Sequence, residues 1–193
     1  MMQNFPERII CFDTEYTAWA GSKERDWGEE GEFREVVQIG AVKLKNLDEV
    51  DSFSRLIQPV KNPNLSEYFS HLTGITQEML AGAIDLDLAL HEFYTWSESL
   101  DLYSYGLDGV VLKENAELLR LSFPFSDSRF LDIRGIFRNI GIATDKYSSG
   151  TILHALGKKP LPHAHDAVND ARSISLALKI LIERNAILGQ LES

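Results

Sequence analysis

Cysteine is nearly absent from the sequence, and long apolar runs are absent altogether. Cys11 is the single cysteine in 193 residues, which excludes an internal disulfide framework and a cysteine-based zinc site. No run approaches the roughly 18 apolar residues that a membrane span needs, and the opening segment MMQNFPERII has no apolar signal-peptide core. The sequence therefore favours a cytoplasmic enzyme or binding domain without a membrane partner.

Basic residues are also in short supply. Lys and Arg number 19 against 29 Asp and Glu, which corresponds to a formal net charge of −10. This balance argues against a protein that holds duplex nucleic acid on a broad basic face, but it suits an enzyme whose acids bind metal ions. Hydrophobic residues make up 44% of the chain, so we expect a folded globule in which residues 1–193 form one domain.

The spacing of apolar residues changes along the chain from strand-like to helical. Three early segments resemble strands, with a turn-like stretch, NLDEVD, between the last two: 8–12, 35–44 and 53–59. Three later segments have helical spacing: 86–100, 110–121 and 166–188. Two further segments are short strand candidates: 102–105 and 129–132. This order predicts an α/β fold in which a mixed sheet is flanked by helices.

Residues 16–34 do not fit this alternation, because they are polar and have no clear period. A loop longer than about 12–15 residues in a compact domain is usually functional or disordered. The segment contains Trp19 and Trp27 interspersed with Lys23, Arg25 and Arg34. Aromatic and cationic side chains together suit single-stranded nucleic acid. The alternative is a surface excursion whose tryptophans pack onto the body of the protein.

Carboxylates stand where apolar residues would be expected. Asp13 and Glu15 follow the first predicted strand, and their spacing of two places both side chains on one face. Two neighbouring negative charges raise each other's pKa unless a cation lies between them. Asp108 follows the short strand candidate at 102–105 and opens a helix, a common place for ligand-binding residues. Asp132, which ends another short strand, and Asp127 are alternatives to Asp108.

The last predicted helix carries a further carboxylate beside its inward stripe. Asp170 lies next to the small and apolar residues of that stripe, where an uncompensated charge is costly. His165 precedes the helix, and a histidine with a pKa near 6.5 can act as a general base over a site formed by the first turn. Asp166 is expected to cap the helix. The alternative for Asp170 is a salt bridge or a helix-capping role, and the alternative for His165 is an ordinary surface histidine.

In combination, these residues resemble the DEDDh family of 3′–5′ exonucleases, which includes ribonuclease T and the proofreading subunit of bacterial replicative polymerase. Three blocks carry the resemblance: FDTEYT, YSYGLDGVVL and HAHDAVNDARS. The third contains the family pattern His-x-Ala-x-x-Asp-Ala. The segment HLTGIT, residues 71–76, is similar to the family's loop beside the substrate's 3′ end. The resemblance extends from about residue 8 to residue 182.

The resemblance implies a ribonuclease H-like fold with a mixed five-stranded sheet. It also implies two-metal hydrolysis of single-stranded nucleic acid, with RNA favoured over DNA, from the 3′ end to nucleoside 5′-monophosphates. Two Mg²⁺ or Mn²⁺ ions are expected to be held by four acids: Asp13, Glu15, Asp108 and Asp170. His165 is expected to take the proton of the attacking water.

Several residues are expected to contact substrate, and some family features are altered. The expected substrate-binding residues are Thr14, Trp19, Arg25, Trp27, Leu72, Thr73, Gly74 and Ile75, with Leu72 or Ile75 stacking on the terminal base. The long 16–34 insertion is similar to the histone-mRNA and small-RNA trimming branch. Leu161-Pro162 stands where many members have glycine, and a homodimer is implied weakly. The alternatives are a catalytically weak binding or regulatory protein on this scaffold and an endonuclease of the ribonuclease H type.

Overall fold

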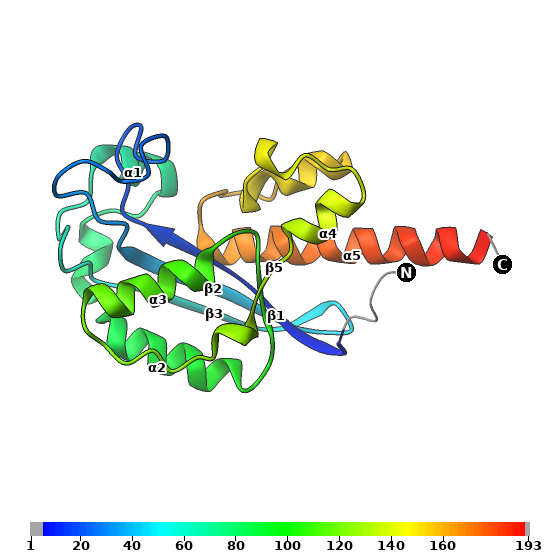
Figure 1. Cartoon of the computed structure of the whole chain (residues 1–193), viewed down its shortest axis with the longest axis horizontal. Coiled ribbons are helices and arrows are strands. Elements are labelled where there is room, and N and C mark those ends of the chain that lie inside the picture. Colours follow the sequence, from blue (N-terminus) through cyan, green and yellow to red (C-terminus); the bar gives the residue numbers. More distant parts are fainter. Residues whose placement is uncertain (1–5, 192–193) are drawn as a thin grey trace.

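The computed structural model describes the backbone of residues 6–191 and the side chains of residues 6–184. Its centre is a five-stranded mixed sheet with the strand order β3-β2-β1-β4-β5 (Figure 1). The first three strands form an antiparallel meander: β1 (Arg8–Tyr16), β2 (Val36–Lys45) and β3 (Asp48–Leu56). The last two run parallel to β1: β4 (Leu102–Ser104) and β5 (Phe130–Asp132). The α/β class and the mixed five-stranded sheet predicted from the sequence are confirmed.

Helices cover both faces of this sheet. One face carries α2 (Leu86–Ser97) and α3 (Asp108–Leu118), and the other carries α5 (Ala167–Leu191) (Figure 1). Two short α-helices lie between these elements: α1 (Glu67–Thr73) and α4 (Arg134–Asn139). The described residues also form four 3-10 helices: η1 (Glu78–Gly82), η2 (Asp127–Arg129), η3 (Thr144–Lys146) and η4 (Ser149–Leu156). Within residues 6–191, no helix combines the length and the apolar character needed to cross a bilayer.

Alternation along β1 decides which face its acids occupy. Ile9 and Cys11 pack against α5, whereas Ile10 and Phe12 pack against α2 and α3. Because successive side chains of a strand point to opposite faces, Asp13 lies on the α5 face. The same apolar alternation that builds two cores therefore directs the acids of β1 toward the start of α5.

The two largest differences from the predicted strand boundaries are at the end of β1 and the start of β3. β1 continues to Tyr16, so Asp13 and Glu15 lie within the strand and not after it, because β2 pairs with β1 along this whole stretch. β3 begins at Asp48, five residues before the predicted start. Asn46 and Leu47 have φ values of 51° and 65°, which build a two-residue hairpin turn. The polar stretch after it is therefore an exposed edge strand.

Candidate active site

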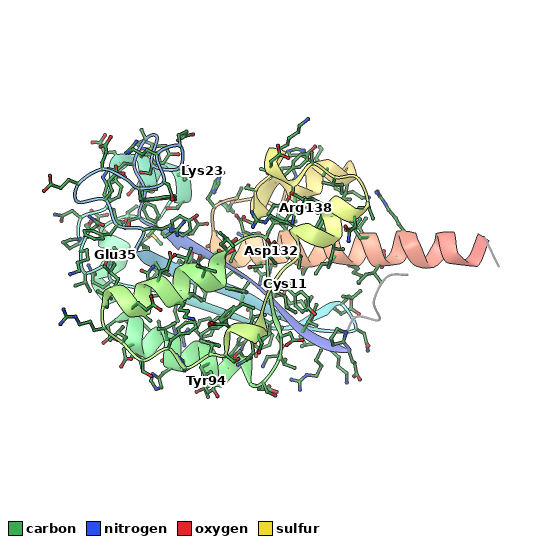
Figure 2. All side chains as sticks on the ribbon, in the orientation of Figure 1. Cys11, Lys23, Glu35, Tyr94, Asp132 and Arg138 are labelled. Atoms are coloured by element: carbon green, nitrogen blue, oxygen red, sulfur yellow. The ribbon has the colours of Figure 1, made fainter. Side chains whose placement is uncertain are left out.

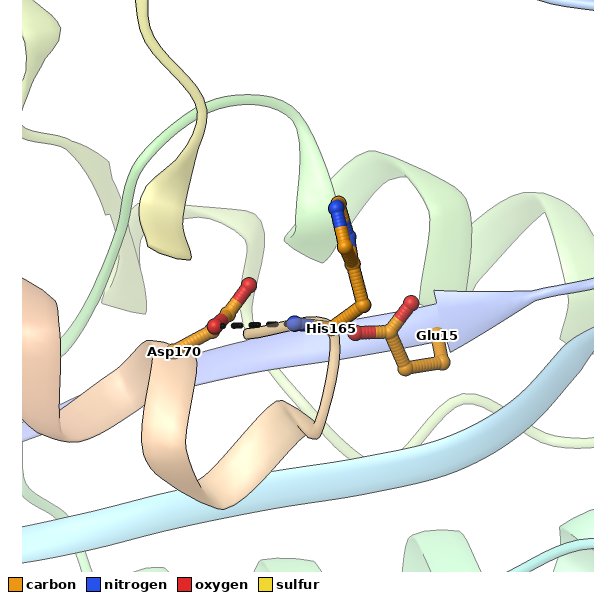
Figure 3. Close-up of side chains that lie close together, drawn as sticks. All are labelled: Glu15, His165 and Asp170. Atoms are coloured by element: carbon orange, nitrogen blue, oxygen red, sulfur yellow. Dashed lines mark hydrogen bonds between the residues drawn. The ribbon is translucent and has the colours of Figure 1, made fainter. Parts of the chain in front are cut away.

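Four buried carboxylates converge at one end of β1. Asp13 and Glu15 come from β1, Asp108 from the start of α3 and Asp170 from the first turn of α5, and none is more than 8% exposed. Ligand atoms of Glu15, Asp170 and His165 all lie within 4.8 Å of one another. Figure 3 shows the two carboxylates on either side of the His165 backbone, with the imidazole standing above them. The structure thus brings together all five residues that the sequence motifs indicated.

Gly40 allows α5 to approach the sheet closely enough to form this group. Gly40 is the β2 residue paired with Asp13. A Cβ atom on Gly40 would lie 2.2 Å from the carbonyl carbon of Ala167 and from the nitrogen of Val168. Only glycine therefore permits the backbone of the first turn of α5 to rest on β2, which places Asp170 next to Asp13.

Hydrogen bonds also fix the start of α5. The Gln38 side chain of β2 accepts from the backbone N–H of Ala167 (3.1 Å) and donates to Asp166 (3.2 Å). Asp166 accepts from the backbone N–H of Asn169 (3.0 Å). The predicted role of Asp166 as the N-cap of this helix is therefore confirmed.

Asp108 is held by the residue between the two acids of β1. The backbone N–H and the hydroxyl of Thr14 both donate to Asp108 Oδ1, at 3.1 and 2.7 Å. The position of Asp108 in the first turn of α3 also favours a negative charge. Thr14 is 4% exposed, so the structure places it as a support for Asp108, and its expected substrate contact stays a prediction.

Asp170 receives hydrogen bonds from two directions. The Ser149 hydroxyl donates to Oδ2 (3.0 Å), and the backbone N–H of His165 donates to Oδ1 (3.3 Å). His165 has a φ of 66°, and this left-handed conformation belongs to the loop that turns its N–H back toward the helix. Gly150 leaves room for the carboxylate, because a Cβ there would lie 2.6 Å from Asp170 Oδ1.

Burial and mutual repulsion raise the pKa values of all four acids. Desolvation is the largest cause for each, and the neighbouring carboxylates add to it, most strongly for Asp13 and Glu15. Hydrogen bonds from Thr14 oppose the rise at Asp108. Desolvation raises the pKa of Asp170 to about 6 although Ser149 and His165 donate to it. The site therefore disfavours four negative charges unless positive charge enters it.

No side chain supplies that positive charge. Within residues 6–184, no Lys or Arg forms an ion pair with any of the four carboxylates. Buried carboxylates normally pair with a cation or bind metal. Oxygen donors of this kind suit Mg²⁺ or Mn²⁺, so the residues present fit divalent metal ions.

His165 lies beside the acids in a form suited to accept a proton. Burial lowers the pKa of its imidazole, and the positive charge of Lys23 lowers it further. The lowered pKa favours the neutral imidazole, which is the form that a general base needs. Lys23 comes from the loop between β1 and β2, so this loop approaches the site from the side opposite α4.

The two alternatives to Asp108 lie in other ion pairs. Lys113 binds Asp127 at 2.6 Å, and Arg134 binds Asp132 at 2.7 Å. An ion pair thus balances the charge of each of these two acids. Asp108 instead points into the group of carboxylates. The structure places Asp108 in the site and leaves Asp127 and Asp132 outside it.

The segment 71–76 ends α1 in a tight turn. Gly74 has a φ of 76° and closes the helix, and a Cβ there would meet nothing within 4 Å. Thr73 donates to Phe69 and accepts from the N–H of Ile75. Ile75 is 3% exposed, whereas Leu72 is 37% exposed. Of the two residues proposed to stack on a base, only Leu72 is therefore accessible.

Most aromatic and cationic side chains of the insertion contact other residues of the same loop or of the adjoining strand. Arg25 pairs with Glu32 and Glu29. Trp27 packs edge-on against Tyr16 and donates from Nε1 to the carbonyl oxygen of Thr17 at 2.8 Å. Trp19 is half-buried, and among the described residues its ring makes no ring or cation contact. Trp19 thus remains available for substrate, while Arg25 and Trp27 hold the loop together.

Sequence reasoning missed the residues that support the site. Gly40, Ser149 and Gln38 orient its acids, and Lys23 acts on His165. A glycine inside a strand pattern is a recognised sign of close backbone approach, so Gly40 could have been identified. Ser149 and Lys23 reach the site only through tertiary packing, which no local pattern reports.

A family model described as Exonuclease, RNase_T, matches residues 10–178. Among curated proteins, the chain is similar to the PolC-type DNA polymerase III of Thermotoga maritima, with 29% identity over 164 residues that cover 80% of this chain and 11% of that protein. It is also similar to ERI1 exoribonuclease 2 of Xenopus laevis, with 30% identity over 100 residues, 51% of this chain and 14% of that protein. The chain thus spans only about an eighth of the length of these relatives.

Solved structures share the fold. The nuclease domain of 3′hExo, a DEDDh family member bound to rAMP, aligns with a TM-score of 0.81 and 22% identity over 95% of both chains. Cell-death related nuclease 4 aligns with a TM-score of 0.75 and 19% identity over 92% of this chain and 64% of that one. These likenesses confirm the predicted ribonuclease H-like fold.

Proposed function

Because the chain belongs to the RNase_T exonuclease family, we propose that it is a metal-dependent 3′–5′ exonuclease that acts on single-stranded nucleic acid. The observation that carries this proposal is the group of four buried carboxylates without an ion-pair partner, next to a neutral histidine. The chain acts as one exonuclease domain, with the insertion at one side of the site. One chain supplies all five groups, and a homodimer stays a prediction of the family resemblance.

The four acids would hold two divalent cations. Asp13, Glu15, Asp108 and Asp170 contribute a formal −4, which two Mg²⁺ or Mn²⁺ ions balance. Bound ions of this kind acidify a water molecule and stabilise the leaving oxygen. The protein's own contribution is to fix the acids in place through Thr14 and Ser149.

His165 would accept the proton of the attacking water on a ring nitrogen. Its burial keeps the imidazole neutral, and its backbone N–H ties it to Asp170. The hydrolysed bond would be the phosphodiester of the last nucleotide, and the product a nucleoside 5′-monophosphate. Leu72 and Trp19 are the accessible side chains that would contact the terminal nucleotide.

RNA is the preferred substrate in this proposal. Support comes from the names of two similar proteins, an exoribonuclease and a nuclease domain bound to rAMP. The similarity to PolC-type DNA polymerases makes DNA the competing substrate. The sugar is distinguished through its 2′-OH, so matched RNA and DNA oligomers separate the two.

The test is a time course with 5′-labelled single-stranded RNA and DNA of the same sequence, with Mg²⁺, with Mn²⁺ and with a chelator. We expect a metal-dependent ladder that shortens from the 3′ end, faster for RNA. A circular single strand should stay intact, because an exonuclease needs an end; its cleavage would indicate an endonuclease. Intact linear oligomers in every lane, with measurable binding, would replace this proposal with a binding or regulatory protein.

A further inference from the structure

Charge is distributed unevenly along the chain. Residues 133–165, which we call the basic lobe, contain five Lys and Arg and a single acid, Asp145. The lobe therefore carries a formal +4 in a chain of −10, and the remaining residues carry −14. It comprises α4, η3, η4 and the loop that leads to α5, coloured yellow to orange in Figure 1.

The cations of the basic lobe lack the ion pairs that other cations of this protein make. Of the 14 Lys and Arg outside the lobe, nine pair with acids among the described residues, but within the lobe only Arg134 does. Four exposed cations of the lobe have no ion-pair partner within residues 6–184: Arg138, Lys146, Lys158 and Lys159. Surface cations left free of acids in so acidic a protein favour an anionic ligand.

The basic lobe is packed firmly against the site. Ile152, Leu153 and Leu156 are buried in the core formed with α5 and β1. Ser149 binds Asp170, and His165 ends the lobe. Figure 2 shows Arg138 in this lobe, across from Lys23 of the insertion. The lobe that carries these cations is thus fixed beside the carboxylates.

Arg134 lies where the basic lobe meets the site. Asp132 accepts from Nε of Arg134 at 2.9 and 3.0 Å and fixes the guanidinium plane. A Cβ on Gly106 would lie 3.9 Å from Nη1 of Arg134 and 3.8 Å from Oδ2 of Asp108. The Arg134 guanidinium and the Asp108 carboxylate therefore both lie beside Gly106. Arg138 follows one turn later on the same side of α4.

We propose that the basic lobe binds the phosphate backbone of single-stranded nucleic acid on the 5′ side of the nucleotide in the active site. This inference rests on the proposed exonuclease function. Arg134 and Arg138 lie nearest the site, and Lys146, Lys158 and Lys159 extend the surface. A nucleic-acid strand is favoured over an acidic protein because the lobe also contributes Ser149 and His165 to the site where such a strand would end.

The test compares two triple variants with the same change in net charge. Lys146→Gln/Lys158→Gln/Lys159→Gln removes free cations of the basic lobe. The control, Lys45→Gln/Lys113→Gln/Lys179→Gln, removes lysines that pair with acids elsewhere. Each is assayed with a single-stranded 20-mer and with the p-nitrophenyl ester of thymidine 5′-monophosphate, which has one phosphate and no 5′ extension.

We expect the basic-lobe variant to raise KM for the 20-mer about 10-fold at 0.1 M salt. The slope of log K, where K is the binding constant for the 20-mer, against log salt concentration should become smaller in magnitude by about 2, the value for three phosphate contacts on a single strand. Turnover of the ester should not change, and the control should resemble wild type. An unchanged KM and salt slope would overturn the proposal and leave an acidic protein as the ligand. Equal losses in both variants would also overturn it, because net charge would then explain the effect.

Anisotropy of the labelled 20-mer with Ca²⁺ present separates this inference from the proposed function. If wild type cleaves neither substrate, the exonuclease proposal fails. A loss of 20-mer binding confined to the basic-lobe variant would still support the proposal that the basic lobe binds single-stranded nucleic acid.

Discussion

The insertion and the basic lobe flank the same site, but they use their charges in opposite ways. The insertion, residues 16–34, carries three cations, and two of them, Arg25 and Arg34, pair with glutamates. The basic lobe carries five, of which one forms an ion pair within the described residues. Aromatic and cationic residues close together in a sequence thus do not show by themselves that the cations are free to bind an anionic ligand.

The two regions also differ in how they contact the acids of the site. The basic lobe donates two hydrogen bonds to Asp170, from Ser149 and from His165. The insertion acts at longer range, through the charge of Lys23 on His165. Loss of a basic-lobe hydrogen bond to Asp170 is therefore expected to slow catalysis. Loss of an insertion contact is expected to change stability or KM.

The largest effect is expected at the acid that the basic lobe holds. Asp170→Asn keeps the size of the side chain but removes a charge that binds metal, and Asp13→Asn should behave in the same way. The rate of hydrolysis should fall more than about 10³-fold, since bound metal supplies several kcal/mol of transition-state stabilisation. Single-turnover cleavage measures this, with circular dichroism to verify the fold. Asp127→Asn is the control, and full activity of Asp170→Asn would rule out the site.

The next effect concerns the last residue of the basic lobe. His165→Ala should slow cleavage roughly 10²–10⁴-fold, as for a lost general base, while Mn²⁺ still raises the melting temperature. The exposed neighbour His163 provides the matched control, and His163→Ala should retain the wild-type rate. If His165→Ala cleaves as fast as wild type, another group accepts the proton.

The charges of the site itself predict a dependence of stability on pH. The folded chain holds protons on its acids at pH values where the unfolded chain has lost them, so the free energy of unfolding falls as pH rises from about 4 through 6 and beyond. For Asp170 the loss is on the order of 3 kcal/mol. In chelator, the melting temperature should be lower at pH 8 than at pH 5. Mn²⁺ should restore it at pH 8 and have little effect at pH 5. A melting temperature that rises with pH in chelator would contradict the proposed repulsion among the four buried carboxylates.

The smallest effects distinguish two tryptophans of the insertion. Trp27→Ala removes an aromatic contact and a hydrogen bond, so it should lower stability by about 1–3 kcal/mol with little change in KM. Trp19→Ala should leave stability nearly unchanged and raise KM, because base stacking contributes about 1–3 kcal/mol. Thermal unfolding and steady-state kinetics on one oligonucleotide check both. The reverse pattern would assign substrate contact to Trp27.

Local patterns in the sequence were sufficient for most of the fold. Alternating apolar residues predicted the order of strands and helices, and they placed Asp13 and Glu15 on one face. They did not predict that β1 continues to Tyr16, because that extension depends on pairing with β2. The short helices α1 and α4 were also missed, since six or seven residues carry too little periodicity to be recognised.

Motif order predicted the acids that the structure brings together, but it could not choose among residues whose role depends on packing. Asp132 was an alternative to Asp108 until its pairing with Arg134 was visible. Ile75 and Leu72 could not be distinguished, because only the contact of Ile75 with Val37, Phe69 and Leu80 removes it from the surface. Such contacts join segments far apart in the chain, which is why the sequence alone leaves them open.

The close approach of α5 to Gly40 also has a consequence for the chain during its synthesis. Asp13 and Glu15 leave the ribosome first, and Asp170 follows roughly 10–30 s later at about 5–20 residues per second. Until α5 docks on β2, the nascent chain has some of the acids but neither Asp170 nor His165 in place. The order of the chain therefore keeps the site incomplete until α5 has been synthesised and has docked on β2.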